Sequence, residues 1–250
     1  MYRPLSMSQS ADDDGFSGLP RADPRMSDTD SPRGAILFDL DGTLVDTLPD
    51  LLWAMNALMG ELGRRMITAR ELRGWIGDGV AALVRRAVDA TGGLSDGSYT
   101  AMTERYHAHY ESHVAVGSRV YPGVEATLRT LRDAGYRMGV CTNKHTGLSV
   151  ALLEALGLRP LFEAVVGGDA LKHRKPSAEH IAATLGAMGM DGGKALMVGD
   201  SENDMAAARN AKIPVIAVSF GYAHVAPMAL GADAVIDDFA VLPELIGRFL

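Results

Sequence analysis

The sequence predicts an α/β fold in which helices cover both faces of a parallel sheet and a helical subdomain is inserted after the first strand. Three observations predict it. Short apolar runs recur along the chain, helical patterns of apolar residues lie between them, and one long interval holds helical patterns alone. Strands that alternate with helices are typical of parallel sheets.

Six short apolar runs are the predicted strands. The first is AILFD at residues 35–39, which is apolar throughout and ends in an acid. The others span residues 138–142, 164–168, 195–200, 214–220 and 234–237. A strand that is covered on both faces carries apolar residues at nearly every position rather than at alternate ones.

Helices are predicted where apolar residues recur at spacings of three and four. One such stripe contains Val124, Leu128 and Leu131, and another runs over residues 148–156. Each places its apolar side chains on one helix face. Gly135 and Gly157 follow these stripes at the position where glycine commonly ends a helix.

The interval from about residue 48 to residue 120 is too long for one crossover helix and contains no strand-like run. Helical stripes lie at residues 48–62, 80–88 and 102–114. The sequence therefore predicts a core formed by residues 33–47 and 120–250, with a helical subdomain at residues 48–119.

Residues 1–32 are rich in Ser, Asp and Pro and show neither the period of a strand nor that of a helix. Such a segment cannot bury an apolar face, so we expect a disordered tail.

Composition excludes several classes of protein. The 250 residues are 47% hydrophobic and 22% charged, as in ordinary globular proteins. The net charge of −7 argues against binding to nucleic acid or anionic lipid. A single cysteine, Cys141, forms no intramolecular disulfide or cysteine-rich zinc site.

With no predicted signal peptide or membrane span, we expect a cytoplasmic protein that binds neither nucleic acid nor a membrane. The sequence carries no signal of oligomeric state.

Polar residues follow the predicted strands at the edge where open parallel sheets bind ligands. They are Asp39 and Asp41 after the first strand, Thr142 and Asn143 after the second, Lys175 after the third, and Asp200 and Asp204 after the fourth. Asp39 and Asp41 are two residues apart on an extended segment, so their side chains point the same way. Gly42 then allows a tight turn that brings backbone N–H groups towards a ligand.

These carboxylates predict a bound cation. Two like charges 4 Å apart repel by about 4 kcal/mol at an effective dielectric constant of 20, so the acids would repel one another and any phosphate. Oxygen ligands with no nearby Cys or His suit Mg²⁺, which usually keeps a substrate phosphate oxygen among its ligands. The Lys175 ammonium adds a second positive charge.

The motifs DLDGTLVDT at residues 39–47, TN at 142–143, KP at 175–176 and GDSEND at 199–204 resemble the haloacid dehalogenase superfamily of aspartyl-phosphate enzymes. They occur in the order of that superfamily, and the similarity extends over about residues 34–245. The resemblance implies a Rossmann-like core sheet, with the inserted helices forming a cap over the site.

Within the superfamily the sequence resembles the bacterial phosphoglycolate phosphatase family. The segments that carry this are WIGDGVAALVRRAV at 75–88, YPGV at 121–124 and CTNK at 141–144. His145 stands where the family usually has a proline, and its KPxP pattern appears as KPSA at residues 175–178. These departures bear on the substrate more than on the reaction class. The resemblance implies Mg²⁺-dependent hydrolysis of a small phosphate ester, 2-phosphoglycolate, to glycolate and phosphate.

The resemblance also implies a role for each motif residue. Asp39 is the nucleophile that forms an aspartyl phosphate, and Asp41 is the general acid and base. The Thr142 hydroxyl, the Asn143 backbone N–H and the Lys175 ammonium hold the phosphate. The implied Mg²⁺ ligands are Asp39, the backbone carbonyl of Asp41, and Asp200, with Asp204 behind them.

Other functions remain open. A hydrolase for a sugar phosphate or nucleotide differs only in the cap, and a phosphomutase shares the first motif. A non-catalytic binding module usually loses the nucleophile or the metal aspartate, whereas both are present here. Dehalogenases lack the second aspartate of the first motif, whereas this chain has Asp41 at that position, which disfavours a dehalogenase. A phosphonate hydrolase needs a cap lysine, and residues 48–120 contain none.

Several polar residues in and beside the insertion are interpreted as structural rather than catalytic or metal-binding. Asp46 and Asp50 fit the dipole of the first inserted helix. His109 and His113 share a helix face, but no carboxylate motif accompanies them, so no metal site is predicted there.

The glycine-rich turn at residues 75–79 fits either a connector or a specificity loop. No substrate role is assigned to Arg85 or Arg86.

Overall fold

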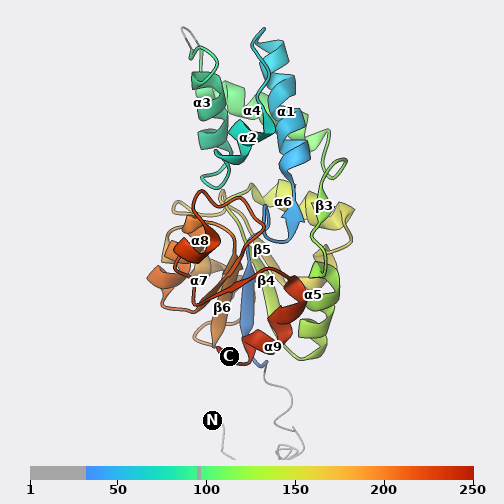
Figure 1. Cartoon of the computed structure of the whole chain (residues 1–250), viewed down its shortest axis with the longest axis vertical. Helices are drawn as coiled ribbons and strands as arrows, with labels where there is room; N and C mark the ends of the chain where they lie inside the picture. The colour runs from blue at the N-terminus through green and yellow to red at the C-terminus, as the bar shows by residue number, and fades with distance from the viewer. Residues whose placement is uncertain (1–31, 95–96) are drawn as a thin grey trace, which may run out of the picture. The chain divides into compact units, whose positions relative to one another are not determined.

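The computed structural model describes residues 32–94 and 97–250, so nearly all of the predicted tail lies outside the described residues. The core is a parallel sheet of six strands in the order β5-β4-β1-β6-β7-β8 (Figure 1). The strands are β1 (Ala35–Phe38), β4 (Arg137–Cys141), β5 (Ala164–Val166), β6 (Ala195–Gly199), β7 (Val215–Val218) and β8 (Ala234–Ile236). Each lies within or beside one of the six predicted apolar runs.

Helices cover both faces of the sheet because successive side chains of β1 point to opposite faces. Ile36 and Phe38 pack with α5 (Val124–Asp133), α6 (Thr146–Ala155) and α9 (Leu242–Ile246). Ala35 and Leu37 pack with α7 (Ala178–Ala187) and α8 (Glu202–Ala211) on the other face. In Figure 1 the α7–α8 layer and the α5–α9 layer lie on either side of the strands. The predicted α/β fold is confirmed.

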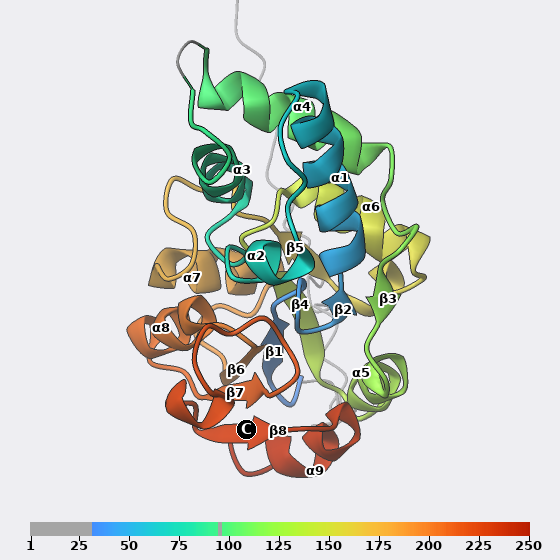
Figure 2. The same cartoon turned by 45° about the horizontal axis from the view of Figure 1, so that its top comes forward.

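Four helices are inserted after β1 and form a group of their own (Figure 1). They are α1 (Leu48–Glu61), α2 (Ala69–Arg73), α3 (Val80–Asp89) and α4 (Tyr99–Glu111), and they share a separate apolar cluster. Helix α2 lies over the loops at the strand ends (Figure 2), where the Arg73 guanidinium donates to the Gly221 carbonyl. In the described part of the chain, no helix combines the length and apolarity needed to cross a membrane.

Two short strands that the sequence did not predict connect this insertion to the core. β2 (Val45–Asp46) and β3 (Arg119–Val120) pair antiparallel, so the chain enters and leaves the insertion side by side. The prediction that residues 48–120 contain no strand is wrong at this edge, because a two-residue strand produces no periodic pattern.

Asp50 holds the same two connections together. Its buried carboxylate accepts hydrogen bonds from Gly117 N at 2.6 Å and from Ser118 N and Oγ at 2.8 and 2.6 Å. Asp50 lies in the first turn of α1, as its structural interpretation expects, but the donors that bond its carboxylate lie at the other end of the insertion.

Replacing Asp50 with alanine is expected to lower the free energy of unfolding by about 3 kcal/mol, because three donors, two of them buried, lose a charged acceptor. Urea denaturation measures the change. Asp133→Ala is the control, since that side chain is 72% exposed and its loss is expected to change stability by less than about 0.5 kcal/mol. Equal stability of the Asp50→Ala and Asp133→Ala proteins would show that Asp50 does not hold the connections.

Candidate active site

The motif residues meet at the carboxyl ends of β1, β4 and β6, which are neighbouring strands. From β1 the chain adds β4 and β5 on one side and β6, β7 and β8 on the other, so this is the point where strand order reverses. Ligands of open α/β sheets bind at such a point. A pocket lies there, lined by five of the predicted residues, Asp39, Asp41, Thr142, Asn143 and Asp200.

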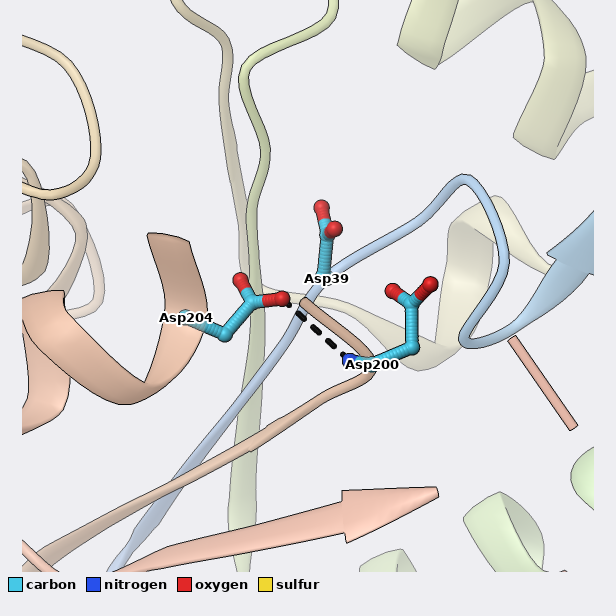
Figure 3. A group of neighbouring side chains, drawn as sticks. All are labelled: Asp39, Asp200 and Asp204. Atoms are coloured by element: carbon cyan, nitrogen blue, oxygen red, sulfur yellow. Dashed lines mark hydrogen bonds between the residues drawn. The ribbon is translucent and has the colours of Figure 1, made fainter. Parts of the chain in front are cut away.

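Three carboxylates lie close together at this pocket, and two of them, Asp39 and Asp200, line it. Oxygens of Asp39, Asp200 and Asp204 lie within 4.8 Å of one another, and they come from the ends of β1 and β6 and from α8 (Figure 3). Burial, together with the neighbouring Asp204 charge, raises the pKa of Asp39 to about 6. Burial and the Asp39 charge also raise the pKa of Asp200. A divalent cation would relieve this repulsion, so the three acids form a candidate metal site.

Asp200 is held in place on both of its oxygens. Oδ1 accepts from the Thr43 hydroxyl at 2.9 Å, and Oδ2 accepts from Tyr222 N at 2.6 Å. Two glycines make room for it: a Cβ on Gly42 would lie 2.5 Å from Oδ2, and one on Gly221 would lie 2.2 Å from the Asp200 Cβ. Gly42 also has a φ of +87°, so the turn after Asp41 requires glycine for two reasons.

Lys175 connects Asp39 to Asp204. Its Nζ lies 2.9 Å from Asp39 Oδ1 and 2.6 Å from Asp204 Oδ1. Burial alone would lower the pKa of Lys175, but the Asp204 and Asp39 carboxylates outweigh it and raise that pKa. The other oxygen of Asp204 accepts from Asp200 N (Figure 3) and also from Ser201 N and Oγ. Asp204 is therefore occupied by protein donors and supports Lys175 and the loop after β6.

His180 on α7 positions the Lys175 loop, a role that the sequence did not predict. Its Nδ1 accepts from Lys175 N at 3.1 Å, and its Nε2 lies 3.1 Å from the Val166 carbonyl. An acceptor at Nδ1 and a donor at Nε2 define the neutral ring. Burial and the nearby Lys175 charge lower the pKa of His180 from 6.5 to about 4.

His180 is expected to make stability depend on pH between about 6.5 and 4. In that window the unfolded chain binds a proton that the folded chain excludes, so stability is full above pH 6.5 and falls as the pH is lowered. The slope from one such group approaches about 1.4 kcal/mol per pH unit. Urea denaturation from pH 7 to 4.5 is expected to show a smaller slope for His180→Gln than for the wild type. The same slope in both proteins would assign the acid sensitivity to other groups.

Asp41 pairs with a lysine for which the sequence suggested no role. Lys144 Nζ lies 3.1 Å from Asp41 Oδ1 and 4.2 Å from the centre of the Tyr110 ring on α4. The Lys144 side chain is only 6% exposed. The sequence offered one indication of a role for Lys144, its position after Asn143 in the TNK segment. Its burial could not be predicted, because it depends on packing against Tyr110 of an inserted helix.

Thr142 and Asn143 lie between the core and the insertion. The buried Thr142 hydroxyl accepts from Lys144 N at 3.3 Å. The Asn143 amide donates to the Gly77 carbonyl at 2.9 Å and to the Lys175 carbonyl at 3.0 Å. Its side chain thus fixes the loop geometry, and the phosphate-binding role of its backbone N–H stays a prediction.

Comparison with known proteins agrees with this geometry. Residues 36–218, most of the chain, match the haloacid dehalogenase-like hydrolase family. The chain belongs to this family.

Family members with curated descriptions are similar to this chain over most of their length. A phosphoglycolate phosphatase of Caulobacter vibrioides is 43% identical over 210 residues, covering 84% of this chain and 89% of the relative. One from Rhodospirillum rubrum is 43% identical over 218 residues, covering 85% and 90%.

Solved structures of the family share the fold. A predicted phosphoglycolate phosphatase from Haemophilus somnus superposes with a TM-score of 0.80 at 31% identity, covering 85% of this chain and 97% of the other. CbbY from Rhodobacter sphaeroides, crystallised with phosphate, gives a TM-score of 0.73 at 25% identity, covering 84% and 96%.

In this haloacid dehalogenase-like hydrolase the turn at residues 75–79 forms part of the pocket wall. Ile76, Gly77 and Gly79 line the pocket. Asp78 is held by core residues: its carbonyl accepts from Arg174 at 2.6 Å, and its carboxylate accepts from Asn203 at 2.9 Å. Of the two interpretations of this turn, these contacts favour the specificity loop over a simple connector.

Four other insertion residues lie outside the pocket lining, in line with their structural interpretation. Arg86 donates to the Trp75 carbonyl at 2.8 Å, and Arg85 lies 4.3 Å from the centre of the Tyr99 ring. His109 and His113 pack against Trp53, and His109 Nε2 lies 2.8 Å from Glu61. Within residues 32–94 and 97–250, neither histidine belongs to a candidate metal cluster.

His145 fits the position where its family usually has proline. Its φ of −61° is a proline-like value, and its Nδ1 accepts from Gly147 N at 3.2 Å to cap α6. The substitution therefore keeps the backbone and adds a side chain at the pocket.

Proposed function

We propose that this protein is a Mg²⁺-dependent phosphatase that hydrolyses 2-phosphoglycolate to glycolate and phosphate through an aspartyl phosphate on Asp39. The observation that carries the reaction class is the buried cluster of Asp39, Asp200 and Asp204 with Lys175 against it. The similarity to phosphoglycolate phosphatases over most of the chain supports the substrate.

The residues present fit a magnesium ion. The donors are oxygens, and their mutual repulsion is relieved only in part by Lys175. We propose that Asp39, the backbone carbonyl of Asp41 and Asp200 hold the ion, with Asp204 supporting them from behind. Bound Mg²⁺ would polarise the phosphoryl group and offset the charge of the acids.

Asp39 and Asp41 carry the two chemical steps. An Asp39 oxygen attacks phosphorus, and the bond from phosphorus to the glycolate oxygen breaks as Asp41 protonates that oxygen. Asp41 then takes a proton from water, and the water oxygen attacks phosphorus, which releases phosphate and restores Asp39. Both carboxylates line the same pocket, so both can reach one bound phosphate ester, as these two roles require.

Lys175, Thr142 and Asn143 hold the group that is transferred. Lys175 is fixed 2.9 Å from Asp39, so it can neutralise phosphate charge beside the nucleophile without moving. Thr142 and Asn143 end β4 on the opposite side of β1 from Asp200. CbbY, which shares this fold, is in complex with phosphate, and this supports phosphate binding by the present chain.

The inserted helices would act as a cap that controls water. Contacts from Asn143 and Arg174 to the 75–79 turn close the pocket against the core. Opening of these contacts would admit substrate, and their closure would exclude bulk water during transfer.

Phosphate release from a substrate panel tests the proposal. The panel contains 2-phosphoglycolate, sugar phosphates and nucleotides, each with Mg²⁺ or with EDTA. We expect EDTA-sensitive turnover in which 2-phosphoglycolate has the highest kcat/KM. A tenfold preference for another ester, about 1.4 kcal/mol in transition-state binding, would overturn the substrate but keep the reaction class. Absence of phosphatase activity with Mg²⁺ would overturn both and favour a binding module.

A further inference from the structure

The pocket has a part that differs in chemistry from the floor formed by Asp39 and Asp200. Among the described residues that line it, Lys144 is the only lysine or arginine. Two tyrosines of α4, Tyr106 and Tyr110, line the pocket as well, one helical turn apart with their rings stacked. This part of the site therefore offers hydrogen-bond donors, whereas the floor offers carboxylates.

The tyrosine hydroxyls differ in their protein partners. Each residue is 1% exposed. The Tyr106 hydroxyl has no hydrogen-bond partner among the described residues, whereas the Tyr110 hydroxyl interacts with the Lys144 ammonium. Buried polar groups are nearly always paired, so the orphan hydroxyl of Tyr106, a residue that lines the pocket, points to a partner that the free protein does not supply. Burial raises the pKa of both hydroxyls, which keeps them protonated as donors.

Lys144 provides the charge. Asp41 and the Tyr110 hydroxyl occupy only part of its donor capacity, since an ammonium has three N–H groups and both contacts to Asp41, at 3.1 and 3.4 Å, go to one carboxylate. An ammonium beside two phenolic donors suits an anion with two acceptor oxygens.

The position of these donors fits the leaving group of the proposed substrate. In 2-phosphoglycolate the carboxylate is attached to the carbon that bears the ester oxygen. If Asp41 protonates that oxygen, the carboxylate must lie within a few ångströms of Asp41, which is where Lys144 is fixed.

We propose that Lys144, Tyr106 and Tyr110 form a subsite that binds the carboxylate of the leaving group and selects phosphate esters that carry one. This inference rests on the proposed function, because it takes the ester oxygen to lie at Asp41. It assigns the choice of substrate to α4 and to the residue after Asn143.

The test compares 2-phosphoglycolate with 2-hydroxyethyl phosphate, in which a neutral hydroxymethyl group replaces the carboxylate. We measure kcat/KM for both esters in the wild type, Tyr106→Phe, Tyr110→Phe and Lys144→Met. The control is Tyr99→Phe, the same change on the same helix, at a hydroxyl that bonds Asp89 outside the pocket. The wild type is expected to prefer the carboxylate ester by about 100-fold or more. Each tyrosine variant is expected to reduce that ratio at least tenfold, mainly through KM, and Tyr99→Phe to retain it.

Thermal unfolding separates this role from a structural one. Because the Tyr106 hydroxyl has no protein partner to lose, the Tm of Tyr106→Phe is expected to equal or exceed that of the wild type. A Tm several degrees lower, or equal loss of activity on both esters, would overturn the subsite. The tyrosine variants keep the test valid if Lys144→Met, which leaves Asp41 unpaired, does not fold.

The wild-type measurements separate this inference from the proposed function. Hydrolysis of both esters without preference for the carboxylate would overturn the proposed substrate and the subsite together. A wild-type preference that persists in all folded variants would overturn the subsite alone.

Discussion

Asp39→Asn is expected to lower kcat for 2-phosphoglycolate by at least about 10⁴-fold, because a neutral amide does not attack phosphorus. The substitution is nearly isosteric, and Lys175 keeps its second carboxylate, Asp204, at 2.6 Å. The variant is therefore expected to fold, with a Tm close to that of the wild type. Phosphate release and thermal unfolding on the same preparation measure both properties.

Asp237→Asn is the matched control for this experiment. Asp237 follows β8 at the same edge of the sheet but lies outside the pocket lining, so its activity is expected to stay within twofold of the wild type. Activity of the folded Asp39→Asn protein within tenfold of the wild type would contradict the role of Asp39 as nucleophile.

Removal of divalent metal is expected to have the second largest effect. EDTA is expected to lower kcat by about 10³-fold or more, since a metal supplies several kcal/mol of transition-state stabilisation, and added Mg²⁺ is expected to restore it. Mg²⁺ at 100 times its Kd is expected to stabilise the wild-type fold by about 2.7 kcal/mol. The stabilisation arises because the ion offsets the repulsion among Asp39, Asp200 and Asp204.

Asp200→Asn tests whether this stabilisation comes from the proposed site. Without Mg²⁺ the variant is expected to be as stable as the wild type, because one buried charge is removed and the Thr43 and Tyr222 hydrogen bonds can be kept. With Mg²⁺ its Tm is expected not to rise. A Mg²⁺-dependent increase in Tm equal to that of the wild type, or activity that resists EDTA, would contradict the assignment.

The sheet could be predicted from the sequence because each strand is marked by a short contiguous run of apolar residues. A strand buried on both faces is apolar at every position, and all six runs became strands of the core sheet. Helices α5 and α6 end two residues before the predicted stops Gly135 and Gly157, which have positive φ values of 86° and 71°. Elements of two to five residues, β2, β3 and α2, were missed because they are too short to repeat a pattern.

The acidic part of the site was also predictable, because Asp39 and Asp200 directly follow strands and Asp41 and Asp204 come within five residues of the same strands. The remainder depends on contacts between segments that lie far apart in the sequence. Lys144 is buried by Tyr110 of an inserted helix, and His180 reaches back to Lys175 and Val166. Tyr106 and Tyr110 belonged to a predicted apolar stripe, and only the packing shows that both residues line a pocket and that their hydroxyls are buried.

The central claim is that phosphate passes through a covalent bond to Asp39. The direct measurement uses Asp41→Asn, in which activation of water is impaired, so that the intermediate accumulates. The protein is incubated with Mg²⁺ and either 2-phosphoglycolate or p-nitrophenyl phosphate, whose leaving group needs no proton, and is quenched in acid for peptide mass spectrometry. With p-nitrophenyl phosphate the account predicts near-stoichiometric phosphate on the peptide that contains Asp39, and with 2-phosphoglycolate less, because Asp41→Asn cannot protonate the glycolate leaving group. Phosphate on another residue, or none on any peptide while the phosphate esters are still being cleaved, would contradict it.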